Sequence, residues 1–359
     1  MPPLLEIENL VVDYVLEDRR VRAVDNVSLS IDPGEVMGLC GESGCGKSTT
    51  AHAILRILRP PAQITGGRIL FKGHDLVPMS ADELRRYRWS QISIVFQSAM
   101  NSLNPVIDIG AQFADMIRAH VPASRGEARK RAENLLQLVG IDRSRVDSYP
   151  HELSGGMRQR VVIAMALALQ PDLIVMDEPT TALDVVVQRE ILQQIQELQD
   201  EFRFAVLYIT HDLSMLIEFA DRIGVMYAGE LVEMGKSETL FRQPRHPYTV
   251  GLMSSFPPLT GPRKIMMGIP GSPPNLANPP PGCRFYPRCP YHDPSKSRLF
   301  DRQMTVKPQL REVDPGHLVA CHLYDADLGT EGVHGLSTDV GARNPELPVL
   351  VEEEVSYAG

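Results

Sequence analysis

GESGCGKST, residues 41–49, is the stretch of sequence that decides the fold. It fits the pattern G-x-x-x-x-G-K-[ST], with an apolar strand-like segment, GEVMGLC (34–40), before it and a helical segment after it. This is the structural context in which the pattern forms a phosphate-binding loop. We therefore expect an α/β fold of the P-loop NTPase (RecA-like) type with a mostly parallel sheet.

The loop residues have distinct expected roles in binding a nucleotide. Backbone N–H groups of residues 44–49 point at the β-phosphate and lie at a helix N-terminus, where the helix dipole favours an anion. Lys47 bridges the β- and γ-phosphates, and Ser48 ligates Mg²⁺. The nucleotide-binding residues expected in this stretch are Gly41, Ser43, Gly44, Cys45, Gly46, Lys47, Ser48 and Thr49.

Composition limits the classes of protein to which the chain can belong. Its 359 residues are 43% hydrophobic and 23% charged, and its net charge of -9 argues against nonspecific binding to nucleic acid. The longest purely apolar run, residues 161–169, is far shorter than the roughly 20 residues of a membrane-spanning helix. MPPLLEIENL at the N-terminus lacks the basic region of a secretory signal. We expect a cytosolic protein that does not span a bilayer.

Three further apolar segments end in residues that can do chemistry. ISIVF (92–96) leads into Gln97, LIVM (173–176) into Asp177 and Glu178, and FAVLYIT (204–210) into His211. Such runs are typical of strands buried on both faces of a parallel sheet, where ligands bind at the carboxyl ends. These side chains and the phosphate loop are therefore expected to meet at one site.

Each of these side chains has a predicted role and a simpler alternative. Asp177 would hold Mg²⁺ through water, and Glu178 would be the general base that polarises the attacking water. Gln97 would lie at the metal and the γ-phosphate, and His211 would contact the γ-phosphate. Alternatively, the two acids only cap a strand, and the histidine is packed or faces solvent.

A second helix start with free N–H groups occurs in LSGGMRQR, residues 153–160. Ser154, Gly155 and Gly156 open this helix, yet the chain already has a complete phosphate loop. We therefore expect this second helix start to serve a phosphate bound elsewhere.

Taken together, LSGGM, the phosphate loop, Gln97, the LIVMDE strand, ALD (182–184) and His211 resemble the ATP-binding subunit of ABC transporters. In that family two subunits pair head to tail, and the signature of one closes over the γ-phosphate held by the other. The resemblance implies that Ser154, Gly155, Gly156, Gln159 and Asp184 act across the dimer, and that Tyr14 stacks on adenine. Alternatively, Tyr14 is a strand tyrosine without a ligand.

Three stretches sharpen the resemblance to the dipeptide and oligopeptide importer ATPases. They are FQSAMNSLNP (96–105), HPYTVGLMSSFP (246–257), and a cysteine-bearing end made of GCRFYPRCP (282–290) and GHLVACH (316–322). The resemblance implies an ATPase that powers peptide uptake from the cytoplasmic face of the membrane, as a peripheral subunit. Alternatives are the same machinery importing nickel or an oligosaccharide, or a soluble ABC ATPase without a permease.

The same resemblance implies a set of partners. They are two transmembrane permease subunits, a second and related but non-identical ATPase, and, indirectly, an extracytoplasmic solute-binding protein. Nucleic acid is not among them. ATP and Mg²⁺ are the expected cofactors.

Cysteines raise the question of a further metal. The family's C-terminal extension usually carries four cysteines that can hold an iron–sulfur cluster, and here Cys283, Cys289 and Cys321 match three of them. The fourth, expected soon after Cys289, is missing. The three could hold a cluster or Zn²⁺ with the help of a histidine, or they could be free thiols.

Changes in composition divide the chain into three expected parts. Residues 1–240 form an ABC nucleotide-binding domain with an inserted helical subdomain at about 100–165. Residues 241–328, rich in proline, form a small irregular C-terminal extension with the cysteines. Residues 329–359, Gly-rich and acidic, are expected to form a weakly ordered tail.

Overall fold

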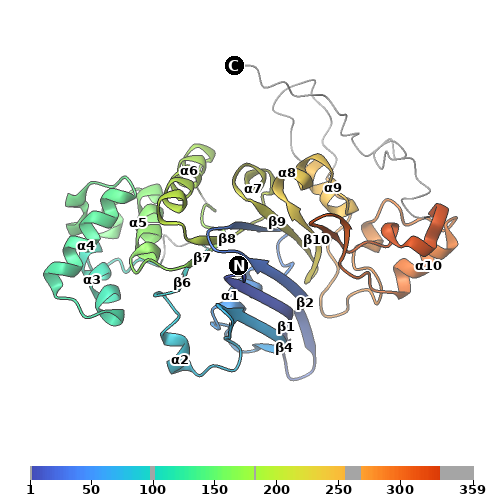
Figure 1. Ribbon diagram of the computed structural model, residues 1–359, viewed down its shortest axis with the longest axis horizontal. Helices are drawn as coiled ribbons and strands as arrows, with labels where there is room; N and C mark the ends of the chain where they lie inside the picture. The colour runs from blue at the N-terminus through green and yellow to red at the C-terminus, as the bar shows by residue number, and fades with distance from the viewer. Residues whose placement is uncertain (1, 98–101, 182, 255–267, 332–359) are drawn as a thin grey trace, which may run out of the picture.

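A computed structural model describes residues 2–97, 102–181, 183–254 and 268–331, and its largest element is a mixed sheet (Figure 1). The strands of this main sheet lie in the order β11-β12-β10-β9-β3-β8-β7-β6. Their bounds are Val36–Cys40 (β3), Ile92–Val95 (β6), Leu173–Asp177 (β7), Ala205–Thr210 (β8), Arg222–Tyr227 (β9), Glu230–Lys236 (β10), Arg311–Asp314 (β11) and His317–Val319 (β12).

Parallel pairing of five strands confirms the predicted α/β fold. Strand β3 pairs in parallel with β8 and β9, β8 with β7, and β7 with β6. Every residue of β3, β6, β7 and β8 is buried, which explains why these segments show no alternation of apolar and polar residues. Because the strands are parallel, the residues that follow them emerge at the same edge of the sheet.

A second, antiparallel sheet lies beside the main one, in the order β2-β1-β4-β5. Its strands are Leu5–Val15 (β1), Arg20–Ile31 (β2), Ala62–Phe71 (β4) and His74–Asp75 (β5). Residues 16–19 form the turn between β1 and β2, where Leu16 N donates to Arg19 O at 2.9 Å. In this hairpin Tyr14 lies opposite Val21, and this pairing fixes where its ring points.

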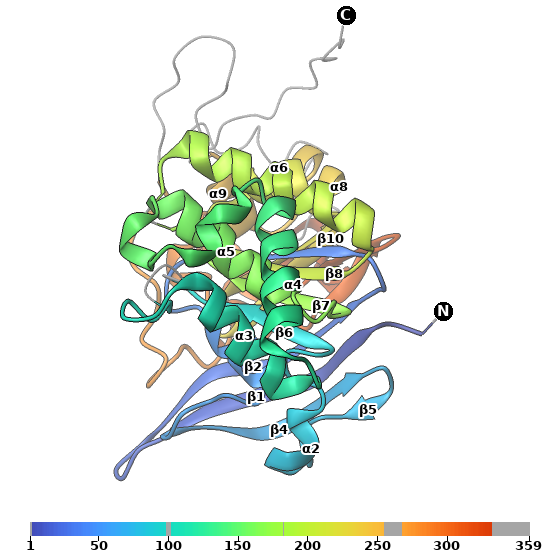
Figure 2. The same cartoon turned by 90° about the vertical axis from the view of Figure 1, so that its left-hand side faces the viewer.

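Helices pack on the sheets and also form a lobe beside them. α3 and α4 pack on each other at one end of the molecule, and α4 also contacts α5 (Figures 1 and 2). Ser124 and Glu127 form a capping box at the start of α4, and Asp108 caps α3. The helices are Lys47–Ile54 (α1), Ala81–Arg85 (α2), Ile109–His120 (α3), Arg125–Leu138 (α4), Gly155–Leu167 (α5), Val185–Phe202 (α6), Leu213–Phe219 (α7) and Ser237–Arg242 (α8).

The C-terminal segment is more regular than the predicted irregular extension. It contains helices Pro247–Ser254 (α9) and Ser297–Thr305 (α10), a short 3₁₀ helix Tyr286–Arg288 (η4), and the hairpin β11–β12. Strand β12 pairs with β10 and so continues the main sheet. Sequence patterns missed this because β11 and β12 are only three or four residues long. The domain boundaries stay predictions, and residues 332–359 of the expected tail lie outside the described ranges.

Phe113 offers a test of how the helical lobe is held together. It is fully buried in α3 within the main core. Phe113→Ala should lower the free energy of unfolding by about 3–5 kcal/mol, because it removes buried apolar area and leaves a cavity. Thermal and urea unfolding would measure this, with Val106→Ala as the control, since Val106 is 74% exposed. Equal unfolding curves for the two variants would contradict this packing.

Candidate functional site

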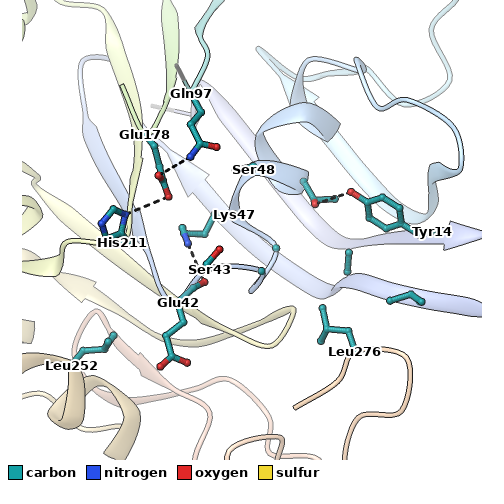
Figure 3. Close-up of a pocket in the computed structure, with 15 residues that line it drawn as sticks. Tyr14, Glu42, Ser43, Lys47, Ser48, Gln97, Glu178, His211, Leu252 and Leu276 are labelled. Carbon is teal, nitrogen blue, oxygen red and sulfur yellow. Dashed lines mark hydrogen bonds and ion pairs between the residues drawn. The ribbon is translucent and has the colours of Figure 1, made fainter. Parts of the chain in front are cut away.

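A cavity of about 760 Å³ lies at the carboxyl edge of the parallel strands (Figure 3). Side chains from both sheets and from the C-terminal segment surround it. Its lining contains ten of the predicted site residues: Tyr14, Ser43, Gly44, Gly46, Lys47, Ser48, Thr49, Gln97, Glu178 and His211. The structure therefore brings together residues that are up to about 200 positions apart in the sequence.

The phosphate loop is tightly constrained where it leaves β3 and where it enters α1. Gly41 and Gly46 have φ of 147° and 106°, values that L side chains rarely adopt. A Cβ at Gly41 would collide with the carbonyl oxygen of Met226, and one at Gly46 with that of Ala23. Lys47 lies inside the loop, and its Nζ donates to Gly41 O at 2.7 Å. This geometry leaves the N–H groups at the start of α1 facing the cavity.

Two oxygen-bearing side chains that could ligate Mg²⁺ lie beside the loop. Ser48 Oγ donates to Asp177 Oδ1 at 2.9 Å, which joins the start of α1 to the end of β7. Burial raises the pKa of Asp177, whereas the hydrogen bond from Ser48 lowers it. A hydroxyl and a carboxylate are hard ligands, so this pair fits a magnesium ion bound together with a nucleotide.

Glu178 is the most constrained carboxylate of the site. Its backbone has φ of 46°, a left-handed conformation that is uncommon outside glycine and is concentrated at functional sites. Its Oε2 accepts from Gln97 Nε2 at 3.1 Å and from Thr181 Oγ1 at 3.0 Å, and its Oε1 lies 3.5 Å from His211 Nδ1. The carboxylate is thus held from three sides, while the His211 side chain stays 63% exposed.

Tyr14 lies at the side of the cavity away from Glu178 (Figure 3). Its hydroxyl is 3.5 Å from Thr49 Oγ1, and the cavity wall beside it includes Val21 and Ala23. An aromatic ring next to small apolar side chains is the kind of surface on which a flat base can stack.

Residues of the LSGGMRQR stretch lie outside the lining of this cavity. Ser154 is exposed and caps α5, because its Oγ accepts from Met157 N at 3.3 Å. Asp184 caps α6 in the same way. Gly155 and Gly156 form the first turn of α5. Gln159 is only 1% exposed in this single chain, and its role across a dimer stays a prediction.

The three C-terminal cysteines do not support the expected metal site. Across the described ranges, no group of three or more His, Cys, Asp or Glu side chains is placed to hold a metal ion. Burial raises the pKa of Cys283 to about 11 and that of Cys289 to about 12. Only three of the four cysteines that a cluster needs are present, and no described His, Asp or Glu side chain completes the set. The residues do not fit either group.

Besides Val21 and Ala23, three residues that line the cavity were not predicted from the sequence. They are Glu42, Leu252 and Leu276, on the side of the cavity opposite Gln97 (Figure 3). Leu252 lies within the HPYTVGLMSSFP stretch, so that stretch could have pointed to it as a residue of the site. Leu276 lies in a proline-rich segment in which no local pattern marks it.

Comparisons with known proteins agree with this architecture. The family model "ABC transporter" matches residues 24–181, and the model "Oligopeptide/dipeptide transporter, C-terminal region" matches residues 232–295. The first range holds the phosphate loop and Glu178, and the second holds most of β10, all of α9 and the first two C-terminal cysteines.

Curated relatives and solved structures are similar over much of the chain. The oligopeptide transport ATP-binding protein OppD of Bacillus subtilis is 46% identical and covers 98% of each chain. The dipeptide transport ATP-binding protein DppD of the same organism is 43% identical, over 90% of this chain and 96% of the relative. A dimer of the ATP-binding cassette MJ0796 bound to ADP and Pi is 31% identical with a TM-score of 0.58, over 65% of this chain and 98% of that one.

Burial of the loop cysteine leads to a chemical prediction. Cys45 lies next to Lys47 Nζ, yet burial raises its pKa above the ordinary thiol value. Because the thiolate is the reactive form, iodoacetamide at pH 8 should label Cys45 at least about tenfold more slowly in the native chain than in urea. Peptide mass spectrometry over time would measure both rates. Fast native labelling would show that the loop opens or that the thiol is ionised.

Proposed function

Because the chain belongs to the family of ABC transporter ATP-binding subunits with the oligopeptide and dipeptide C-terminal region, we propose that it hydrolyses ATP to drive peptide uptake through a membrane permease. The observation that carries this proposal is the cavity in which the phosphate loop, the Ser48–Asp177 pair and Glu178 meet. The names of its relatives favour peptides over nickel or oligosaccharides as cargo.

Phosphate binding falls to the loop. The N–H groups at the start of α1 and the Lys47 ammonium hold the β- and γ-phosphates of ATP. Ser48 and Asp177, with Gln97 beside them, would hold Mg²⁺, which neutralises phosphate charge when bound. Tyr14 stacks on the adenine at the opposite side of the cavity. These assignments rest on the positions of the side chains around one cavity.

Glu178 is the general base of this proposal. Its carboxylate takes a proton from the water that attacks the γ-phosphate. Gln97 and His211 both contact this carboxylate, and they orient it and the water at the γ-phosphate. A fixed carboxylate does not have to reorganise during the reaction, and this lowers the barrier.

A second ATPase subunit completes each site in this proposal. Ser154, Gly155 and Gly156 lie at a helix start outside the cavity of their own chain, where they can close over the γ-phosphate of a partner. Val185 and Val186, next to Asp184, are 69% and 68% exposed on the first turn of α6. Covering such apolar side chains favours a dimer seam there. The partner is a related, non-identical ATPase.

In this proposal, binding to permease subunits holds the chain at the membrane. None of the helices that the structure describes is long and apolar enough to cross a bilayer. By analogy with its relatives, which are peptide-transport ATP-binding proteins, the chain works as a peripheral subunit at the cytoplasmic face, bound to two transmembrane permeases, while an extracytoplasmic binding protein delivers the cargo. ATP favours the closed ATPase dimer, and hydrolysis lets it open.

Replacing the proposed base tests the catalytic assignment. Glu178→Gln should lower kcat for ATP hydrolysis about 10²–10⁴-fold, because the amide cannot accept the proton, and should leave ATP binding intact. Phosphate release would be measured on the transporter complex purified from native membranes, and binding of a fluorescent ATP analogue on the purified chain. Glu201→Gln, an exposed change on α6, is the matched control. A Glu178→Gln variant with the control's kcat would remove Glu178 from the base role.

Transport and partners are tested in the cell. Deleting the chain should abolish uptake of radiolabelled di- and oligopeptides, and the wild type but not Glu178→Gln should restore it. Affinity purification from native membranes in mild detergent should recover two multi-span proteins and a second ATPase. Normal peptide uptake in the deletion strain, or recovery of the chain alone from the soluble fraction, would overturn the transport proposal.

A further inference from the structure

An ion pair between Arg288 and Glu42 joins the C-terminal segment to the phosphate loop. Arg288, the last residue of η4, has only 5% of its side chain exposed. Its Nη1 donates to Glu42 Oε2 at 2.7 Å, and its Nη2 donates to Glu42 Oε1 at 3.0 Å. Glu42 is the second residue of the phosphate loop. A two-pronged guanidinium–carboxylate contact thus joins positions 246 residues apart.

Further contacts fix the guanidinium in this position. Arg288 Nε donates to Pro270 O at 2.8 Å, and Nη1 also donates to the Tyr227 hydroxyl at 3.3 Å. The ring of Tyr227 lies 4.7 Å from that of Tyr248 and 5.2 Å from that of Phe285, between centroids. This aromatic cluster joins β9, α9 and the segment before η4. Arg288 therefore has little freedom to turn away from the loop.

The backbone of the same loop residue is also held from the C-terminal segment. Glu42 N donates to the hydroxyl of Tyr248, a fully buried side chain of α9, at 2.8 Å. Glu42 O accepts from Lys47 Nζ at 3.2 Å. One loop residue is thus fixed through its N–H, its carbonyl and its carboxylate. Leu252 and Leu276 of the same segment also line the cavity.

Charge explains why Glu42 needs this partner. Its side chain is partly buried, 28% exposed, in a loop whose N–H groups and lysine are arranged for the phosphates of ATP. An uncompensated negative charge there would repel phosphate and would attract Lys47. Arg288 neutralises the carboxylate and turns it away from Lys47 Nζ, which donates to the Gly41 and Glu42 carbonyl oxygens and lies 3.7 Å from Cys45 Sγ.

We propose that Arg288 is a positioning residue for ATP, which makes nucleotide binding depend on a docked C-terminal segment. The inference rests on the proposed function, since it assumes that the loop binds ATP. Arg288 acts through Glu42: it cancels the charge of that carboxylate and keeps the loop in its phosphate-binding shape. Residues between Tyr14 and His211 form most of the proposed ATP site, and Arg288 of the C-terminal segment completes it.

Variants that remove the charge of Arg288, of Glu42 or of both test the proposal on the purified full-length chain. Arg288→Met should weaken binding of a fluorescent ATP analogue and raise KM about tenfold or more, because it leaves Glu42 partly buried and unpaired. Adding Glu42→Gln to it should restore affinity to within about threefold of wild type. Arg288→Lys, which keeps the charge but not the fork, should be intermediate. The loss should be larger for ATP than for AMP.

Arg302→Met is the matched control within the same segment. Arg302 forms a similar two-pronged contact, to Asp327 at 2.7 and 2.6 Å, among the C-terminal elements. The Arg302→Met variant should bind ATP like the wild type. If Arg288→Met also binds like wild type, or if the double variant is no better than Arg288→Met alone, Arg288 is a structural anchor only and the inference fails.

Lys47→Ala separates this inference from the proposed function. Loss of ATP binding in Lys47→Ala together with normal binding in Arg288→Met would reject the inference and leave the ATPase intact. Absence of ATP binding in the wild-type chain would reject the proposed function itself. Melting curves of each variant show whether a loss of affinity comes from unfolding.

Discussion

The close approach of the phosphate loop to two backbone carbonyls is the constraint on which the rest of the site depends. Gly41 and Gly46 pass so near Met226 O and Ala23 O that no Cβ fits at either position. Those carbonyls belong to β9 of the main sheet and β2 of the antiparallel sheet. The loop can therefore take its shape only when both sheets are in place, and its N–H groups are then fixed without help from a ligand.

The strand that leads into the loop also determines where the other functional side chains lie. Strand β3, which leads into the loop, pairs residue by residue with β8 and β9, and β8 pairs with β7. Parallel pairing carries Asp177, Glu178 and His211 to the same edge as the loop. The strain at Glu178 is tolerated because the neighbouring elements hold it: its N–H donates to Ile209 O, and three side chains contact its carboxylate.

Much of this site could be read from the sequence, because its signals are local. A glycine-rich loop after an apolar run, and an acid, amide or histidine directly after a buried strand, each need only a few consecutive residues. Parallel pairing then places Gln97, Glu178 and His211 around one cavity without further information. Tyr14 was found only by resemblance, since nothing local distinguishes it from any other strand tyrosine.

The rest could not be predicted, because it depends on contacts between distant segments. No pattern near Glu42 or Arg288 reveals that they pair, and the two short strands β11 and β12 are strands only because β10 offers them an edge. The burial of Gln159 on α5 likewise depends on tertiary packing, and its role across a dimer stays a prediction. The cysteines matched a spacing, but whether a set of ligands meets around a metal depends on tertiary packing, and no such set occurs among the described residues.

The pairing of β12 with β10 sets an order of events during synthesis. A ribosome that has finished β10 must add roughly 80 more residues before β12 emerges, which takes on the order of ten seconds. During that interval β10 is an open edge with unpaired N–H and C=O groups, the kind of surface that templates aggregation. The nascent chain is thus most vulnerable late in translation, and a premature stop before His317 would make that vulnerability permanent.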